Sequence, residues 1–330
     1  MDLLDRLQLD HPLAQAGMSN MSPASLAAAV ARAGGLGTIG TCAPSTLMKG
    51  IDQVRQEAPG RAVAVNLLMP FVNSRHIEVC VEHKINVAVV AFGGDAEVVG
   101  RLRDAGIVVF VMVGTEVQAR TAVDSWQADG LIAQGDEAGG HLTGRQSAHA
   151  FLPTALEIAG NRRPVLLAGG IADAVDTRAA LNAGAAGVVA GTRFLLTHES
   201  PAHPAYQARM LELDRTIRTR LFGLGWPAPH RVLPNAATRR WCHPDGSPKA
   251  LPGLLNAGSA FLARFAPADA EPDAILRLQR PALPFFSPAA PAKGMPDHWI
   301  ERSALYAGDA ARRIHSVVSA AEAVALLAPY

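Results

Sequence analysis

The chain has 330 residues and a mass of 34.6 kDa; 49% of its residues are hydrophobic, 18% are charged and only 5% are aromatic. This composition supports a sizeable core and excludes a globally disordered chain. Thirty Lys and Arg residues against 29 Asp and Glu give a net charge of +1, which argues against a dedicated nucleic-acid binder.

The first predicted elements set up a regular alternation that runs from residue 12 to about residue 200. Short apolar runs alternate with helical patterns, and the runs are continuously apolar, as in parallel strands covered on both faces. The predicted strands are residues 12–16, 35–40, 62–68, 85–92, 107–113, 129–134, 164–170 and 186–191. The predicted helices include residues 23–33, 44–57, 94–105, 115–127 and 173–183. Eight such strands predict a TIM (β/α)₈ barrel, with a doubly wound open sheet as the second choice.

The alternation stops after residue 200. A helix is expected over residues 203–221, residues 226–300 are rich in Pro, Arg and His without a strand period, and residues 301–326 return to helix formers. We therefore expect the barrel to comprise residues 1–200 and 301–330. We expect residues 201–300 to form an appended, mainly helical, Pro-rich region that covers the substrate at the barrel mouth.

The ends of the last two barrel strands carry glycines. Ala168, Gly169 and Gly170 close the seventh strand, and Gly191 and Thr192 follow the eighth. Glycine lets backbone N–H groups approach an anion, and a following helix N-terminus favours negative charge. Either pair alone is explained by a tight turn. Both pairs together, at the two strands where this fold repeatedly builds a phosphate site, favour phosphate binding.

The loop after the sixth strand, QGDEAGGHLTG, carries the most chemistry. Histidine titrates near neutral pH, so His141 can act as a general base, a general acid or an oriented hydrogen-bond donor. Gly139 and Gly140 leave room for a flat ligand beside it. The alternative is a surface loop histidine. For Asp136 and Glu137, loop hydrogen bonding is favoured over metal binding because no second ligand cluster accompanies them.

Other polar residues are expected to be structural or solvated. This group comprises His76, His83, His149, His198, His203, His230 and His243, together with the basic turn at Arg239 and Arg240. The scattered Cys42, Cys80 and Cys242 predict neither a disulfide framework nor a metal site. Neither a signal-peptide run nor a span of ~18 apolar residues is found, so we expect a cytoplasmic protein without a membrane partner.

The segments AGMSN, GGLGTIG, VNLLMPF, DGLIAQGDEAGGHLTG, LLAGGIAD and GAAGVVAGTRFLLTHES, in this order, resemble the nitronate monooxygenase family, formerly called 2-nitropropane dioxygenases. The related FMN-dependent enoyl-ACP reductases are also similar. The resemblance covers about residues 10–200 and implies a TIM barrel that holds FMN non-covalently. The IMP dehydrogenase group shares the LAGGI and GAAGVVAGT segments. That group needs a nucleophilic Cys on the sixth loop, where this chain offers His141.

The resemblance implies roles for the matched residues. The FMN phosphate is expected on Gly169, Gly170, Gly191 and Thr192, the ring against Gly17, Met18 and Ser19, and polar ring contacts from Asn66 and Gln134. His141 matches the family's active-site histidine, which acts as a base toward a nitroalkane or stabilises the flavin–substrate state. Some members have Lys near the fifth strand end, where this chain has Met112.

The function implied is an FMN-dependent oxidoreductase that oxidises an alkyl nitronate or a similar activated carbon acid with O₂. Two alternatives stay open at this point. One is an enoyl-thioester reductase on the same barrel with NAD(P)H as co-substrate, and the other is a flavin-binding protein without catalysis. The partners expected are a small-molecule substrate and O₂, and the apolar surface expected of the Pro-rich region makes a homodimer reasonable.

Overall fold

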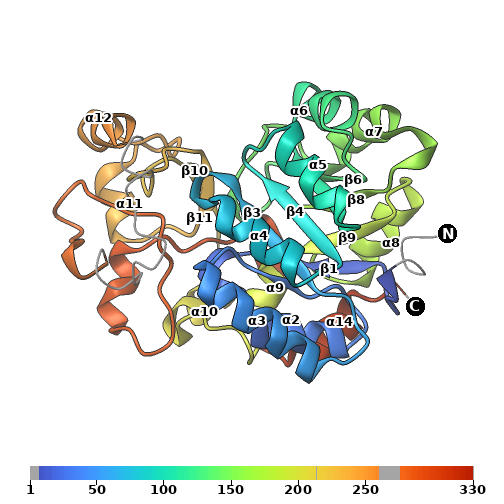
Figure 1. The fold of residues 1–330 in the computed structure, drawn as a ribbon. Helices are drawn as coiled ribbons and strands as arrows, with labels where there is room; N and C mark the ends of the chain where they lie inside the picture. Colours follow the sequence, from blue (N-terminus) through green and yellow to red (C-terminus); the bar gives the residue numbers. More distant parts are fainter. Residues whose placement is uncertain (1–6, 213, 260–275, 330) are drawn as a thin grey trace.

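The computed structural model describes residues 7–212, 214–259 and 276–329 (Figure 1). All eight predicted strands are present. They are β1 (Leu13–Gln15), β2 (Thr38–Ile39), β3 (Ala64–Leu68), β4 (Val87–Ala91), β5 (Val108–Val113), β6 (Gly130–Gln134), β8 (Val165–Ala168) and β9 (Gly187–Ala190). They form one parallel sheet in the order β1-β9-β8-β6-β5-β4-β3-β2.

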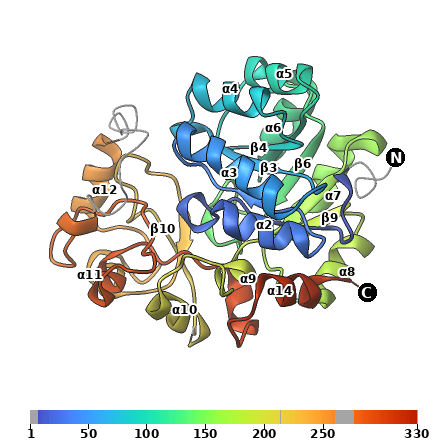
Figure 2. The ribbon, with the colours of Figure 1, turned by 60° about the horizontal axis from the view of Figure 1, so that its bottom comes forward.

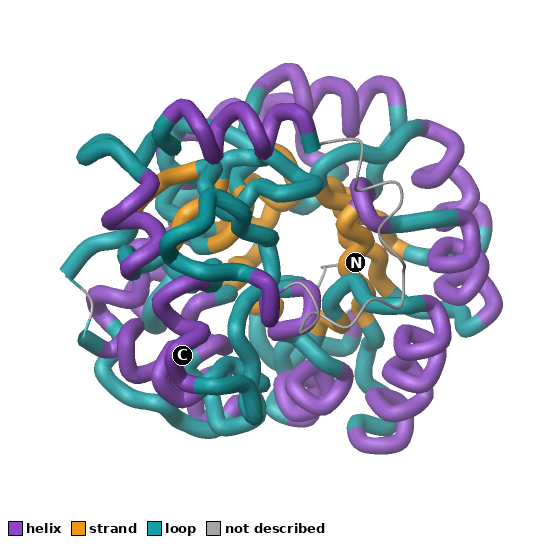
Figure 3. The backbone as a smooth tube through the Cα atoms, turned by 90° about the vertical axis from the view of Figure 1, so that its left-hand side faces the viewer, coloured by secondary structure: helices purple, strands orange, loops and turns teal. Residues whose placement is uncertain are grey.

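β1 and β2, the first and last strands in this order, meet and close the sheet into a barrel. The Gln15 amide donates to the Leu36 carbonyl at 2.9 Å, and the Leu36 amide donates to the Leu13 carbonyl at 2.9 Å. Figure 3 shows the resulting ring of strands inside a ring of helices. The predicted TIM barrel is confirmed. The alternative, a doubly wound open sheet, is wrong, because the two edge strands of an open sheet do not pair with each other.

Helices cover the outside of the barrel. They are α2 (Ala24–Arg32), α3 (Pro44–Glu57), α4 (Ser74–Glu82), α5 (Ala96–Asp104), α6 (Glu116–Arg120), α7 (Ala148–Ala159), α8 (Ala174–Asn182) and α14 (Ala320–Leu327). Several begin at a side chain that accepts a first-turn N–H group, such as Asp95 for α5 and Ser147 for α7. The helix expected over residues 115–127 is divided, because α6 continues into a π-helical turn at Thr121–Ser125. None of the described helices is long and apolar enough to cross a membrane.

The barrel has an inner and an outer apolar layer, which explains its continuously apolar strands. Along β4, Val87 and Val89 pack inside the barrel, whereas Ala88 and Val90 pack against the helices. Phe110 of β5 fills the interior and is 1% exposed. A strand buried on both faces carries no polar alternation.

The C-terminal helix α14 packs against α2 and α8, so the end of the chain rejoins the barrel (Figure 2). Little of residues 301–319 is α-helical. The 3₁₀ segment Asp297–Arg302 ends at the start of this stretch, and Asp309–Arg313 forms a second 3₁₀ segment.

The appended region and residues 301–314, which pack against it, form a lobe beside the barrel, gold to orange-red in Figure 1. It contains α9 (Thr192–Leu195) at its base, α10 (Pro204–Leu211), β10 (Ile217–Thr219), β11 (His230–Val232), α11 (Ala236–Trp241) and α12 (Ala250–Gly258). The helix expected over residues 203–221 is wrong beyond Leu211. The chain instead forms β10, which pairs with β11. No local sequence pattern indicates this strand pair.

The lobe therefore contains strands as well as helices. β10 and β11 pair antiparallel, and β11 pairs with β7 (Gly140–His141), a short strand from the sixth barrel loop. A three-stranded sheet thus joins the lobe to the barrel.

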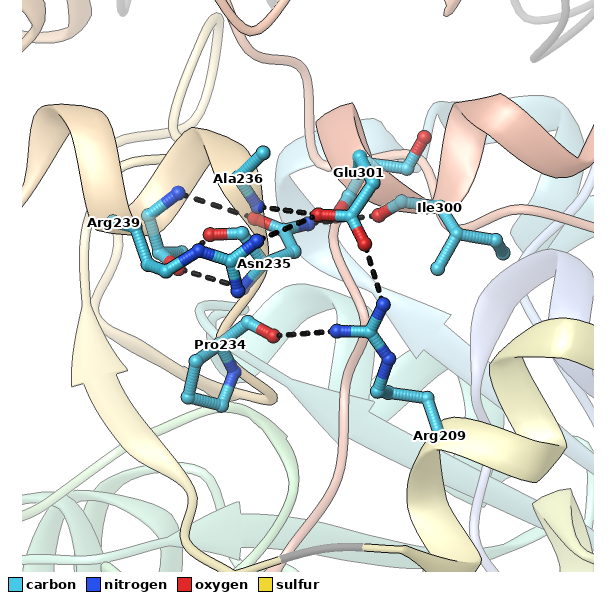
Figure 4. A network of polar contacts seen from close by, with 9 residues as sticks. Arg209, Pro234, Asn235, Ala236, Arg239, Ile300 and Glu301 are labelled. Carbon is cyan, nitrogen blue, oxygen red and sulfur yellow. Dashed lines mark hydrogen bonds and ion pairs between the residues drawn. The ribbon is translucent and has the colours of Figure 1, made fainter.

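A polar network centred on Glu301 holds the lobe segments to one another (Figure 4). The Glu301 carboxylate pairs with Arg209 of α10 and, at 3.1 Å, with Arg239 of α11. It also accepts the Ala236 amide at 2.7 Å. The side-chain amide of Asn235 donates to two carbonyls of the 297–303 segment at 2.9 Å each. Arg239 is expected from the sequence to be a solvated basic residue; its side chain is largely exposed, and it also pairs with Glu301.

Candidate active site

A cavity of about 1000 Å³ lies at the C-terminal ends of the barrel strands, and lobe residues such as Trp226 and Tyr306 close it from above. Every residue that the sequence indicated for catalysis or cofactor binding lines this cavity. These are Gly17, Met18, Ser19, Asn66, Gln134, Gly139, Gly140, His141, Ala168, Gly169, Gly170, Gly191 and Thr192. Segments from most of the barrel strands thus meet in one place.

One end of the cavity is built from backbone. Gly169 and Gly170 have φ angles of 121° and 72°, a left-handed conformation that glycine adopts without strain. Their amide groups have no acceptor within the described protein. Thr192 begins α9, and its hydroxyl accepts the Gly308 amide at 3.0 Å. Free amides beside a helix N-terminus suit an anion.

Arg313 supports the backbone cradle formed by Gly169 and Gly170, and no sequence motif indicates this role. Its guanidinium donates to the Gly170 carbonyl at 2.6 Å and pairs with the Asp176 carboxylate at 2.8 Å. Asp176 in turn accepts the Ala172 amide at 2.7 Å at the start of α8. The 3₁₀ segment Asp309–Arg313 thereby fixes the turn that follows β8.

The opposite wall is formed by the loops after β1 and β3. A Cβ at Gly17 would lie 2.2 Å from the Asn66 Cβ, so the approach of these two loops requires glycine. The Asn66 Oδ1 is buried and has no hydrogen-bond partner in the described protein. Ser19 and Phe92 line the cavity with φ angles of 49° and 60°. Left-handed conformations of residues other than glycine cluster at functional sites.

Gln134 lies on the cavity wall, but its side chain is used within the protein. Its Nε2 donates to the His141 carbonyl at 3.0 Å, and its Oε1 accepts the Thr143 amide and hydroxyl at 2.9 Å each. Gln134 thus holds the sixth loop in place. Gly139 faces the lobe, where a Cβ would lie 2.5 Å from the Gly308 nitrogen.

The ring of His141 is enclosed by other rings. It stacks on Trp226 with centroids 3.7 Å apart and planes 20° apart, and Tyr306 lies 5.5 Å away and Phe92 6.1 Å away. Burial, with a smaller contribution from His230, holds the pKa of His141 well below its usual value of 6.5. Its Nε2 is buried without a hydrogen-bond partner in the described protein. The imidazole is therefore neutral at neutral pH.

His230 is buried behind His141, with ring centroids 5.1 Å apart. Its Nδ1 donates to the Ala228 carbonyl at 3.0 Å, and its Nε2 accepts the Phe222 amide at 3.3 Å. Burial lowers the pKa of His230 to about 4, so the ring stays neutral. The expectation that His230 is structural is confirmed. Sequence reasoning missed Trp226 and Tyr306 as site residues, because they come from the lobe, where no motif marks them.

The remaining polar candidates have structural partners. Asp136 pairs with Arg218 at 2.9 Å and with Arg231 at 2.7 Å, and Glu137 accepts the Ala148 amide at 2.9 Å, as loop hydrogen bonding predicts. Burial raises the pKa of the Cys42 thiol, at the cavity wall, to about 11. Within the described ranges, no group of three or more His, Cys, Asp or Glu residues could hold a metal ion.

Comparison with known sequences places the chain in a family. The model described as nitronate monooxygenase matches residues 2–71 and 48–329. The chain is 37% identical over 238 residues to the (3aS,4S,5R,7aS)-5-hydroxy-7a-methyl-1-oxo-octahydro-1H-indene-4-carboxyl-CoA dehydrogenase of Mycobacterium tuberculosis. That match covers 70% of this chain and only 65% of the length of the relative.

Solved structures extend the similarity to nearly the whole chain. FabK from Thermotoga maritima is similar with a TM-score of 0.77 and 27% identity, covering 98% of this chain and 94% of FabK. The nitroalkane oxidase from Streptomyces ansochromogenes is similar with a TM-score of 0.74 and 28% identity, covering 98% and 96%. The chain therefore belongs to the nitronate monooxygenase family.

Proposed function

We propose that this chain is an FMN-dependent oxidoreductase of the nitronate monooxygenase type, which oxidises an alkyl nitronate or a similar activated carbon acid with O₂. The observation that carries this proposal is the placement of His141. Its neutral ring, with Nε2 unpartnered, lines the same cavity as the free amides of Gly169 and Gly170.

The cavity residues fit a phosphorylated, flat cofactor. A volume of about 1000 Å³ lies at the upper end of the usual range for ligand sites, which leaves space for a cofactor and a substrate. The amides of Gly169, Gly170 and Thr192 would hold the phosphate. Gly17, Met18, Ser19 and Asn66 would lie against the ring, where the Asn66 Oδ1 awaits a donor.

In this arrangement the protein orients the substrate and handles its proton. FMN, when bound, supplies the acceptor for the substrate's electrons. For a neutral nitroalkane, the basic nitrogen of the neutral His141 ring would take the α-proton, whereas a nitronate arrives without that proton and His141 would only orient it. Stacking on Trp226 fixes the ring plane, and the pairing of β7 with β11 fixes the backbone of His141. The lobe keeps water away from this proton transfer.

Anaerobic stopped-flow absorbance of the yellow holoprotein tests the proposal. We expect an alkyl nitronate to bleach the flavin and NAD(P)H to leave it oxidised. A colourless protein that takes up no FMN, or a flavin that no nitronate reduces, would contradict the proposal.

With a neutral nitroalkane as substrate, His141→Ala is expected to retain flavin and to lose at least about 100-fold in turnover, because general-base catalysis contributes about 10²–10⁴-fold. His149→Ala is the matched control, since His149 is exposed on α7. Steady-state oxygen consumption compares the two variants. Unchanged activity in His141→Ala would remove His141 from the mechanism.

An enoyl-thioester reductase is the second candidate. The Mycobacterium relative named as a carboxyl-CoA dehydrogenase brings a thioester substrate into consideration. Bleaching by NAD(P)H followed by reoxidation with an enoyl thioester would favour this reaction. Reduction by neither reagent would favour the third alternative, a flavin-binding protein without catalysis.

A further inference from the structure

The Nε2 atom of His141 is closed off by the protein itself. It is buried and has no hydrogen-bond partner in the described protein. The indole of Trp226 lies almost flat against the ring, with centroids 3.7 Å apart and planes 20° apart. Phe92 is farther away, edge-on at 6.1 Å. A molecule in the cavity therefore cannot touch Nε2 while the neighbouring rings keep these positions.

Two of the neighbouring rings are held in place by hydrogen bonds. His230 uses both ring nitrogens, toward the Ala228 carbonyl at 3.0 Å and the Phe222 amide at 3.3 Å. The Tyr306 hydroxyl donates to the Pro288 carbonyl at 2.8 Å. Turning either ring away would leave a buried polar group without its partner, which is costly.

Trp226 is the neighbour that can turn without breaking a hydrogen bond. It stacks on His141 and meets Phe92 edge-on at 5.0 Å. Among the described residues its indole N–H has no acceptor, unlike that of Trp241, which donates to the Pro281 carbonyl at 2.8 Å. Trp226 is also only half-buried, so its side chain borders solvent as well as the cavity.

The backbone that carries Trp226 is fixed on the lobe. The Leu224 amide donates to the Phe286 carbonyl at 3.1 Å, and the Gly225 amide donates to the Ser259 hydroxyl at 2.9 Å. A movement of Trp226 is therefore a rotation of its side chain about the Cα–Cβ and Cβ–Cγ bonds, with the lobe staying where it is.

We propose that Trp226 is the gate of His141: its indole covers the ring in the closed state, and a substrate reaches Nε2 only after the indole turns away. This inference rests on the proposed function, because it takes His141 as the residue that the substrate must reach. The closed gate keeps bulk water from Nε2 between turnovers. The open gate admits the reacting group without unfolding any part of the lobe.

Diethyl pyrocarbonate tests the gate without any turnover. A neutral imidazole nitrogen attacks this small electrophile and becomes ethoxycarbonylated, while ethanol and CO₂ are released, so the rate reports access to the ring. Peptide-resolved mass spectrometry of the holoprotein follows His141 and the exposed His149. We expect His141 to react at a finite rate that is at least about tenfold below that of His149, because a minor open state is populated at up to about 10%.

Substitution of Trp226 should open the site. We expect His141 to react at least about tenfold faster in Trp226→Ala than in wild type, with His149 unchanged. Trp226→Phe keeps a smaller cover and should give at least about a threefold increase, which decides the question if Trp226→Ala does not fold. Trp241→Ala is the matched control, because it removes an indole that lies on the same lobe and does not line the cavity.

Several outcomes would overturn the inference. A wild-type His141 as reactive as His149 would mean that the ring is open, and one that stays unmodified after complete modification of His149 would mean that Trp226 is a fixed wall. An unchanged His141 rate in a folded Trp226 variant contradicts the gate as well. So does acceleration of the wild-type rate by dilute urea, because local unfolding exposes much surface and a side-chain rotation exposes little.

Flavin bleaching separates this inference from the proposed function. If the modification rates are as expected but neither a nitroalkane nor a nitronate bleaches the flavin, the proposed function fails and the gate stands. If a nitroalkane bleaches the flavin but His141 reacts equally in wild type and in both Trp226 variants, the gate alone fails.

Discussion

The ring of His141 shows how neighbouring side chains set a protonation state. Trp226 covers one face, and His230, Tyr306 and Phe92 approach from other directions. These neighbours exclude the water that would stabilise an imidazolium ion, so burial favours the neutral ring. The internally bonded His230 adds no negative charge that would offset this effect.

The pH dependence of turnover follows from this burial. A base whose pKa is lowered stays active until the pH falls through that pKa, so kcat/KM for a neutral nitroalkane should be flat between about pH 6 and about pH 8, below the range where the substrate itself ionises. Its decline should begin only at lower pH. A pH series with wild type and His141→Gln measures this. An inflection at or above pH 6.5 in wild type that is absent from His141→Gln would contradict the expectation.

Substitution of Gly170 tests whether the backbone cradle binds the cofactor phosphate. Its φ of 72° strains any other L-residue, so Gly170→Ala should cost about 1–2 kcal/mol of stability and misplace the amides that would bind phosphate. Gly60→Ala is the control, because Gly60 has a similar φ of 78° in an exposed turn with open space around it. Thermal melts should shift similarly for both variants. Flavin titration should show at least about tenfold weaker affinity in Gly170→Ala alone.

At the scale of elements, the active site depends on segments that are distant in sequence. β7 of the barrel loop pairs with β11 of the lobe, and the Leu142 amide donates to the Pro229 carbonyl at 2.8 Å just beyond the pair. Asp136 adds ion pairs to Arg218 of β10 and Arg231 of β11. The lobe therefore contributes to the placement of His141 as well as covering the cavity.

Arg313 connects the C-terminal 3₁₀ segment to the cradle, and its removal should weaken cofactor binding. Arg313→Met deletes the bond to the Gly170 carbonyl and the pair with Asp176. We expect flavin affinity to fall about three- to tenfold, with little change in the thermal midpoint because the pair is partly exposed. Arg75→Met, which breaks exposed pairs on α4, serves as the control. Equal flavin affinity in both variants would show that Arg313 does not support the cradle.

At the scale of the whole molecule, the barrel is held together by its interior layer. Phe110 packs against Gly130 of the neighbouring strand β6, where a Cβ would lie 2.4 Å from the Phe110 ring. Val87, Val89 and Ile132 belong to the same interior cluster. This layer lies beneath the cavity and supports the strand ends that carry the site.

Truncating Phe110 tests that support. Phe110→Ala should destabilise the protein by about 3–5 kcal/mol, through lost burial and the cavity left behind. Val117→Ala should change stability by less than about 0.5 kcal/mol, since Val117 is 75% exposed. Urea denaturation followed by circular dichroism compares the two midpoints. A small shift in Phe110→Ala would mean that the interior relaxes around the missing ring.

Much of the barrel and of its glycine-rich edge could be predicted from the sequence. The alternation of apolar strands with helices is local, and the strand ends of a barrel meet at one face whatever the loops contain. The pairing of β11 with β7 could not be predicted, because it joins residues about 90 positions apart. The internal role of Gln134 and the stacking of Trp226 on His141 likewise depend on contacts that no local pattern records.

β7 and β11 pair through main-chain groups, so this pairing does not depend on particular side chains. A backbone ladder tolerates exchange of the side chains that project from neighbouring positions. Lobe residues that face the cavity, such as Trp226 and Tyr306, can thus be exchanged while the strand that carries His141 stays attached. The backbone position of His141 can then be kept while lobe residues at the cavity change.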